Sequence, residues 1–189
     1  MQITSGKLAR INIKSCIKSS ARPTSSRLRT NICNILTHNY HELLSGATLD
    51  AFAGFGTMSF ELLSIGCKDI VAFEQSPYTF KILVENRQKI ISSNNDIEMV
   101  CLRKDVLSYK LGFINKCFSI VFIDPPYAKL SYIPRLIHNL KRNNSINKNT
   151  LLILETSKKD LDFINQLDIQ VIKSTQAASS VATFAHANL

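Results

Sequence analysis

The sequence predicts an α/β protein built on a parallel sheet that is covered by helices on both faces. From residue 48 onward, short apolar runs typical of strands alternate with segments in which apolar residues recur at helical spacing. An acidic residue also follows five successive predicted strands, at Asp50, Glu74, Asp105, Asp124 and Glu155. Because ligands of open parallel sheets bind beyond the carboxyl ends of the strands, these acids predict a ligand site at that edge.

The expected elements follow from this alternation. The predicted strands are 48–53, 69–73, 97–102, 119–123, 151–154 and 169–172, with 181–184 as a further candidate. The predicted helices are 58–64, 80–91, 132–140 and 161–167. Before them, residues 2–4 and 10–17 could pair as a hairpin, and a helix capped by Thr24 or Ser25 runs to about His38. We therefore expect a basic hairpin-and-helix appendage at 1–45 and the main domain at 46–189.

The composition is that of a compact globular protein. The chain has 189 residues, of which 45% are hydrophobic, and this suits a single domain with a substantial core. No apolar run approaches the roughly 20 residues of a membrane span, and no signal peptide is expected. Five scattered cysteines without a C-x-x-C pair indicate reduced thiols in the cytoplasm. The four histidines have no ligand-like spacing, so we expect no metal site.

Positive charge is concentrated at the N-terminus. The net charge is +9, and the first 41 residues carry seven lysines and arginines but no acid. A segment of one sign favours contact with a polyanion such as RNA, although a solubilising basic tail is an equally good interpretation of charge alone. If RNA is the partner, the candidate contacts are Lys7, Arg10, Arg22, Arg27 and Arg29.

A glycine-containing turn follows the first predicted strand, from Asp50 to Ser59. Gly54 and Gly56 in G-x-G spacing allow a tight turn and close approach of a ligand to the backbone. Ser59 stands where a dinucleotide-binding turn has its third glycine, and the acids after the strands would repel phosphate. S-adenosylmethionine has a ribose, an amino group and a sulfonium cation but no phosphate, so the pattern favours it over NAD or ATP.

The tetrapeptide Asp124-Pro125-Pro126-Tyr127 follows the fourth predicted strand. Two prolines stiffen this turn and leave its carbonyl oxygens free to accept hydrogen bonds. The Asp124 carboxylate and the Pro125 carbonyl can then hold both hydrogens of an exocyclic amino group and stabilise charge developing on its nitrogen. Tyr127 offers a ring on which a base can stack, once that base has left its own stack. A rigid turn that merely ends a strand is the less favoured interpretation.

These motifs resemble the RsmD family of bacterial methyltransferases. The matching segments are Arg22-Pro-Thr-Ser-Ser-Arg-Leu-Arg29, Leu49-Asp-Ala-Phe-Ala-Gly-Phe-Gly56, and Phe118 to Tyr127. The resemblance implies a Rossmann-like, seven-stranded, S-adenosylmethionine-dependent fold. It also implies methyl transfer to the N2 amino group of a guanine in small-subunit (16S) ribosomal RNA, with that RNA or the small-subunit particle as partner and a monomeric enzyme.

The resemblance also assigns roles to individual residues. Asp124, Pro125, Pro126 and Tyr127 would bind the guanine and carry the catalysis. The cofactor residues would be Asp50, Ala53, Gly54, Gly56, Glu74, Gln75, Asp105 and Val106. Among these, Glu74 would hold the ribose and Asp105 the adenine amino group. Phe55 and Ser59 depart from the family's usual small residue and glycine.

Three other functions stay open at this point. An adenine-N6 DNA methyltransferase can use the same tetrapeptide, although the chain has no room for a separate domain that reads DNA sequence. A non-catalytic RNA-binding or assembly protein could retain a degenerate methyltransferase fold. Protein glutamine methylation usually prefers Asn before Pro-Pro-Tyr, whereas this chain has Asp124 there.

Overall fold

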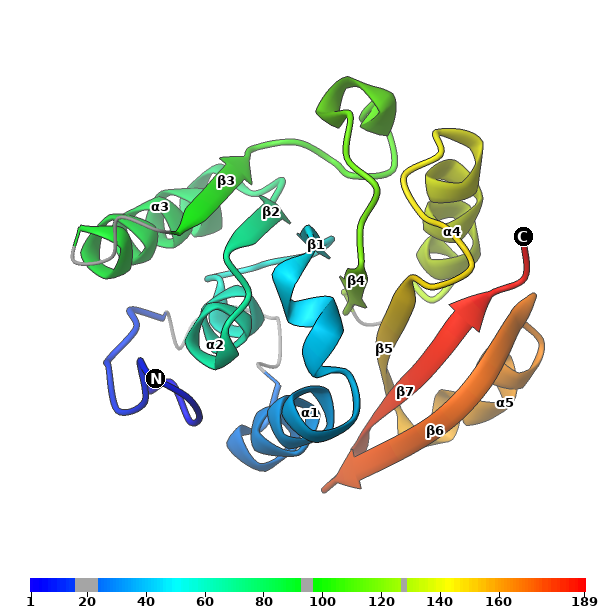
Figure 1. The fold of residues 1–189 in the computed structure, drawn as a ribbon, viewed down its shortest axis with the longest axis horizontal. Helices are drawn as coiled ribbons and strands as arrows, with labels where there is room; N and C mark the ends of the chain where they lie inside the picture. The colour runs from blue at the N-terminus through cyan, green and yellow to red at the C-terminus, as the bar shows by residue number, and fades with distance from the viewer. Residues whose placement is uncertain (16–23, 93–96, 127–128) are drawn as a thin grey trace.

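The computed structural model describes residues 1–15, 24–92, 97–126 and 129–189. A seven-stranded sheet runs through it in the order β3-β2-β1-β4-β5-β7-β6 (Figure 1). The strands are β1 (Thr48–Asp50), β2 (Asp69–Phe73), β3 (Glu98–Leu102), β4 (Ile120–Ile123), β5 (Leu151–Ser157), β6 (Ile169–Ala177) and β7 (Ser180–Ala187). Every strand predicted after residue 45 is therefore present.

The parallel sheet that the alternation of strands and helices predicted is continued by antiparallel strands at its C-terminal end. Strands β1 to β5 pair in parallel, but β7 is antiparallel to both β5 and β6. Only Ala178 and Ser179 connect β6 to β7, and Ala178 adopts a left-handed conformation with φ of 53°. A two-residue connection makes a hairpin, whereas a parallel pair needs a crossover of about a dozen residues.

The described residues form five α-helices beside the sheet: α1 (Ser26–Asn39), α2 (Thr57–Ile65), α3 (Pro77–Ile91), α4 (Tyr132–Arg142) and α5 (Leu161–Asn165). The side chain of Ser25 caps α1 by accepting the Leu28 N–H, as the sequence predicted. Ser76 caps α3 in the same way, and Pro77 occupies the first turn where its missing N–H has no cost. No helix within the described parts of the chain is long and apolar enough to cross a membrane.

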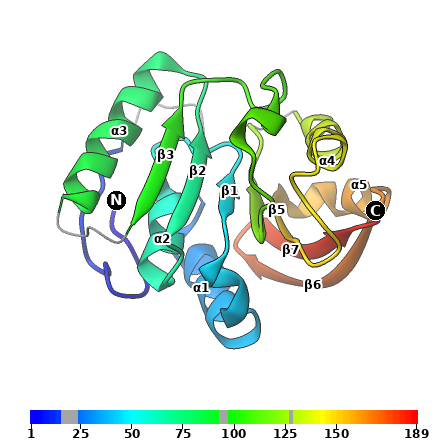
Figure 2. The same cartoon turned by 45° about the horizontal axis from the view of Figure 1, so that its top comes forward.

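The helices divide between the two faces of the sheet and form two cores (Figure 2). The first core joins α1, α2 and α3 to strand residues such as Ile70, Phe122 and Ile153. The second core joins α4 and α5 to the alternate strand residues, among them Val121 and Leu154. Successive side chains of a strand point to opposite faces of the sheet. The core to which the last residue of a strand belongs therefore shows on which face the next side chain lies.

The N-terminal segment packs into the first core. Ile3, Leu8 and Ile13 are buried there beside residues of α1 and α2, and the segment lies beside α2 and α3 in Figure 1. Of the predicted hairpin, the described residues form a single antiparallel bridge between Gln2 and Asn12. Residues 1–45 therefore share their core with the sheet, and packing is continuous across the expected boundary at 45.

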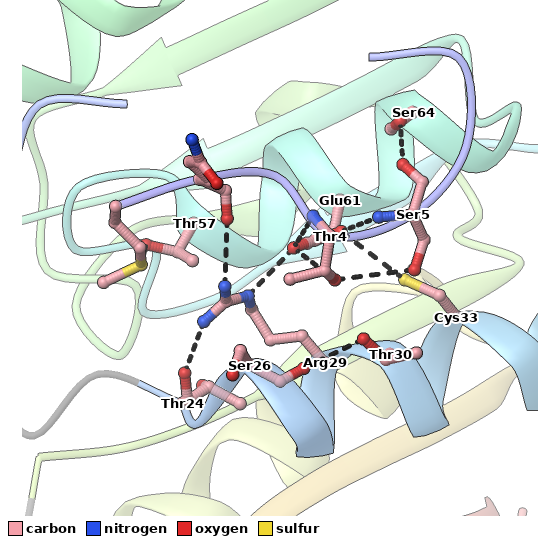
Figure 3. Close-up of polar contacts among 12 residues, drawn as sticks. Thr4, Ser5, Thr24, Ser26, Arg29, Thr30, Cys33, Thr57, Glu61 and Ser64 are labelled. Atoms are coloured by element: carbon pink, nitrogen blue, oxygen red, sulfur yellow. Dashed lines mark hydrogen bonds and ion pairs between the residues drawn. The ribbon is translucent and has the colours of Figure 1, made fainter. Parts of the chain in front are cut away.

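A buried ion pair connects the N-terminal segment, α1 and α2 (Figure 3). The Arg29 side chain is 3% exposed and donates from Nε to Oε1 of Glu61, 2.9 Å away, while Glu61 is fully buried. The Arg29 guanidinium also donates to the carbonyls of Thr24 and Gln2, and Glu61 accepts from the backbone N–H of Thr4. The prediction that Arg29 contacts RNA is therefore wrong, because its donors are occupied inside the protein.

Replacing Arg29 with Met should destabilise the protein by about 3–5 kcal/mol, because the Glu61 carboxylate would stay buried without a cation. Adding Glu61→Gln removes the orphaned charge while keeping an acceptor, so the double variant should recover part of this loss. Urea denaturation measures both. Arg27→Met is the matched control, since Arg27 is exposed on the same helix and should change stability by less than about 0.5 kcal/mol. A loss below about 1 kcal/mol for Arg29→Met would contradict this account.

Candidate active site

The register of the parallel strands brings acidic residues together at the carboxyl edge of the sheet. Asp50 is the last residue of β1 and pairs with Ala72 of β2 and Phe122 of β4. Glu74 and Asp124 each stand two residues beyond these partners. Because side chains two residues apart share a face, Glu74 and Asp124 point to the same side of the sheet as Asp50.

A fourth acid joins this group from β5. Ile123 pairs with Leu154, so Asp124 and Glu155 are neighbours one step further along two strands spaced roughly 4.8 Å apart. Both follow residues of the second core and therefore face the first core, on the side of α1, α2 and α3. We call Asp50, Glu74, Asp124 and Glu155 the carboxylate cluster.

The turn after β1 leaves room beside the cluster. Gly54 has φ of +56°, and a Cβ added to it would meet nothing within 4 Å. Gly56 has φ of +86°, and a Cβ there would lie 2.5 Å from Leu83 and Phe60. Gly56 is thus required for packing as well as for backbone conformation, whereas Gly54 borders open space. Phe55, the bulky residue between them, is buried, and its carbonyl accepts from Nδ2 of Asn86 at 3.0 Å.

Asp50 is a buried carboxylate with one unused oxygen. The Ser59 hydroxyl donates to Oδ2 at 2.6 Å, while Oδ1 has no hydrogen-bond partner among the described residues. Burial raises the pKa of Asp50 to about 6; hydrogen bonds from Ser59 and from the Phe52 backbone oppose this rise, and the nearby Glu74 carboxylate adds to it. Ser59, which replaces a glycine of the family pattern, therefore orients this acid.

The next two acids are positioned by backbone N–H groups. The N–H of Ser76 donates to Oε1 of Glu74 at 2.7 Å, and burial still raises the pKa of Glu74. The N–H of Leu107 donates to Oδ1 of Asp105 at 2.9 Å. Of the other predicted cofactor residues, Ala53 and Val106 are buried, and Gln75 is exposed directly after Glu74.

The loop after β4 begins with a carboxyl group whose pKa is raised. Burial raises the pKa of Asp124 well above its usual value, and the carboxylates of Glu155 and Asp50 raise it further. Pro125 is buried, and no N–H of the described residues donates to its carbonyl, whereas the Pro126 carbonyl accepts from Lys129 at 3.1 Å. Asp124 and Pro125 thus both carry oxygen atoms that can accept hydrogen bonds from a ligand. Tyr127 lies outside the described residues.

Two contacts that the sequence reasoning missed connect the site to the N-terminal segment. The Thr24 hydroxyl donates to Oε2 of Glu155 at 2.6 Å, so the residue before the α1 cap is fixed to the carboxylate cluster. Asn86 exchanges two hydrogen bonds with the backbone of Lys14 while it holds the Phe55 carbonyl. Both residues of the first contact stood out in the sequence, Thr24 in the R-P-T signature and Glu155 as an acid after a predicted strand. Their contact could not be predicted, because it joins segments that are far apart in the sequence.

The predicted RNA-binding residues do not gather in one place. Arg10 and Arg27 are exposed, and Arg10 lines a cavity of about 610 Å³ beside Thr24 and the start of α1. Lys7 is exposed too, but its N–H donates to the carbonyl of Ser64, at the end of α2 away from the carboxyl edge. Arg22 lies outside the described residues.

Comparison with known proteins identifies the family. The family model described as "Conserved hypothetical protein 95" matches residues 1–185. The chain belongs to this family. A Haemophilus influenzae relative named "Ribosomal RNA small subunit methyltransferase D" is 30% identical over 72% of this chain and 68% of that protein. "Uncharacterized methylase RP545" of Rickettsia prowazekii is 27% identical over 92% of each chain.

The relatives named methyltransferase D confirm the RsmD family that the motifs indicated. Among solved structures, "Putative methyltransferase yhhF from Escherichia coli" superposes with a TM-score of 0.75 at 18% identity, over 99% of this chain and 97% of that one. Together with the strand order, this confirms the predicted Rossmann-like methyltransferase fold.

Two features of the structure suit S-adenosylmethionine as the ligand of this RsmD-family site. Gly54 borders open space, and Oδ1 of Asp50 is a buried acceptor that lacks a partner among the described residues. Within those residues, no cation forms an ion pair with Asp50, Glu74 or Asp124. A cationic ligand with hydrogen-bond donors would complete such a site, and a phosphate would be repelled by it. Metal-binding groups of three or more His, Cys, Asp or Glu are not found in the described parts of the chain.

Replacing Asp50 with Asn should change how stability depends on pH. The folded-state pKa of about 6 lies above the ordinary value of 3.8, so ionisation of Asp50 disfavours the folded state. Asp50 therefore stabilises the fold below pH 4 relative to higher pH, and this contribution is lost as the pH rises through 6. The loss is at most about 3 kcal/mol, and Asp50→Asn should lack it.

The test is urea denaturation of both proteins without ligand between pH 4 and pH 7. The stability of Asp50→Asn relative to wild type should increase steadily across this range. If the stability of both proteins depends on pH in the same way, ionisation of Asp50 does not destabilise the fold and this account is contradicted.

Proposed function

We propose that this protein transfers a methyl group from S-adenosylmethionine to the exocyclic N2 amino group of a guanine in small-subunit ribosomal RNA. The observation that carries the proposal is the loop Asp124-Pro125-Pro126, which presents two acceptors within a cluster of buried and half-buried carboxylates at the carboxyl edge of the sheet. Membership of the RsmD family and the name of the Haemophilus influenzae relative support ribosomal RNA as the substrate.

The cofactor would lie across the ends of β1, β2 and β3. The unused oxygen of Asp50 and the open space at Gly54 would take the methionine half, where the amino group and the sulfonium both carry positive charge. Glu74 would accept from ribose hydroxyls, and Asp105 from the adenine amino group. When bound, S-adenosylmethionine supplies an activated methyl group on a sulfonium cation.

Asp124 and Pro125 would hold the nucleophile. An exocyclic amino nitrogen is a weak nucleophile because its lone pair is delocalised into the base. Two acceptors, the Asp124 carboxylate and the Pro125 carbonyl, would favour a pyramidal nitrogen and stabilise the positive charge that develops on it. The nitrogen must lose a proton once it is alkylated, and Asp124, whose pKa is raised by burial and by the Glu155 and Asp50 carboxylates, is suited to accept it.

The function is tested by methyl transfer from radiolabelled S-adenosylmethionine to small-subunit ribosomal RNA, offered both free and as the isolated small subunit. Wild type should label one guanine, identified by mass spectrometry of the nucleosides as N2-methylguanine. Asp124→Ala should lower the rate at least a hundred-fold, while calorimetry shows cofactor affinity within a few-fold of wild type. Asp162→Ala, which removes an exposed acid from α5, is the matched control and should behave as wild type.

Three outcomes would contradict this proposal in different ways. Labelling of adenine in DNA, but not of RNA, would favour the adenine-N6 methyltransferase. Failure to bind the cofactor would favour a non-catalytic RNA-binding protein. Equal loss of cofactor affinity and rate in Asp124→Ala would show that Asp124 belongs to the cofactor site rather than to the site of the accepting base.

A further inference from the structure

Two exposed cations lie over one aromatic ring at the start of α4. Nζ of Lys129 is 5.0 Å from the centroid of the Tyr132 ring, and Cζ of Arg135 is 6.0 Å from it. The Tyr132 ring is half-buried, while Lys129 and Arg135 are exposed. These cation–π contacts restrain the two cations, each with an energy of about 0.5–1 kcal/mol at a surface. We call Lys129, Tyr132 and Arg135 the α4 cation cluster.

The cluster is joined directly to the loop proposed to carry the catalysis. The N–H of Lys129 donates to the Pro126 carbonyl at 3.1 Å, and the N–H of Tyr132 donates to the Lys129 carbonyl at 2.9 Å. Two backbone hydrogen bonds thus connect Pro126 through Lys129 to the start of α4. The backbone that carries the cluster is therefore anchored close to Asp124 and Pro125, at the carboxyl edge of the sheet.

The Tyr132 ring also contacts a second aromatic ring. It stacks on Phe52 with ring centroids 6.3 Å apart and an interplanar angle of 24°. Phe52 stands two residues after Asp50, in the turn that follows β1, and both rings pack against the second core. The cluster therefore contacts the loops after β1 and β4, which form the site. It lies on the face of the sheet opposite to the carboxylate cluster.

The cations of the cluster remain available to an external anion. No carboxylate of the described residues forms an ion pair with Lys129 or Arg135. A cation over a ring face keeps N–H groups that point away from the ring, and arginine in particular can donate two parallel hydrogen bonds to a phosphate. The residues thus combine exposed positive charge, restricted motion and unused donors.

We propose that the α4 cation cluster binds phosphates of the RNA strand that flank the target nucleotide, on the opposite side of the catalytic loop from Arg10 and Arg27. This inference rests on the proposed function. A nucleotide that enters the loop is continued by backbone in both directions, and phosphate contacts fix its register without reading its sequence. Contacts from both sides would hold the strand while the base leaves its stack.

The positive charge of the α4 cation cluster could also bind an acidic protein. RNA is favoured because the cluster adjoins the acceptors proposed for a nucleobase. The Thr24 contact with Glu155 also places the basic start of α1 on the other side of the same loop. A ligand held by both surfaces must pass the Asp124 loop, as a nucleic acid substrate does.

The test compares two double variants that lose the same charge. Lys129→Gln with Arg135→Gln removes both cations of the cluster. Arg142→Gln with Lys148→Gln removes two exposed cations at the last residue of α4 and in the loop before β5, at the amino edge of the sheet. Binding of a fluorescent fragment of small-subunit ribosomal RNA is measured by anisotropy over a range of KCl concentrations, and cofactor binding is measured by calorimetry.

The cluster variant should bind the RNA about ten-fold more weakly near 0.1 M KCl. The slope of log affinity against log salt should fall by about 1.4, since each single-strand phosphate contact contributes about 0.7. Its cofactor affinity should equal that of wild type, which also shows that it is folded. The control variant should keep the wild-type slope.

The inference is overturned if the cluster variant keeps the wild-type affinity and slope, or if both double variants weaken binding equally, which would reflect net charge alone. Either result leaves the proposed function intact as long as wild type methylates the RNA. A steep salt dependence that is lost only in the cluster variant, with no methyl transfer by wild type, would instead support the RNA contact and reject the proposed activity.

Discussion

The constraint on which this structure depends is the crowding of four carboxylates on one face of a parallel sheet. Strand register sets their positions: three acids lie at or just beyond the ends of β1, β2 and β4, Glu155 lies beside them within β5, and each acid faces the same helices. Burial raises the pKa values of Asp50, Glu74 and Asp124, and repulsion from neighbouring carboxylates adds to the rise for Asp50 and Asp124. A site of this kind lowers the stability of the ligand-free protein and favours a ligand that carries positive charge.

In the N-terminal segment, two arginines that are close in sequence have different roles, one in the core and one at the surface. Arg27 and Arg29 are two residues apart on α1, so the helix directs them roughly 200° apart. Arg29 enters the core and meets Glu61, whereas Arg27 stays exposed. A hydrogen bond from Thr24 to Glu155 and two hydrogen bonds exchanged between Asn86 and the Lys14 backbone connect the same segment to two sides of the site. The segment is therefore part of the framework that shapes the site and also carries cations at its surface.

The order and type of the elements, and the acids after the strands, could be predicted from the sequence because both depend on local patterns. Arg29 was misassigned because a count of charges does not show which residues pair with each charge. The sequence nevertheless contained a sign that Arg29 is buried. Arg29, Ile32, Cys33 and Leu36 recur at helical spacing, so Arg29 belongs to the apolar face of α1. The antiparallel β7 could not be inferred from alternation alone, since it depends on the two-residue connection. The stacking of Tyr132 on Phe52 joins residues 80 apart in sequence and required the tertiary structure.

The central claim is that the crowded carboxylates form a site for a cationic methyl donor. Titration calorimetry at pH 6, in two buffers of different ionisation enthalpy, counts the protons released when a ligand binds. S-adenosylmethionine should release protons as its positive charge favours the ionised acids, and S-adenosylhomocysteine, which lacks the sulfonium charge, should release fewer. Equal release by the two ligands, or binding of neither, would contradict the account.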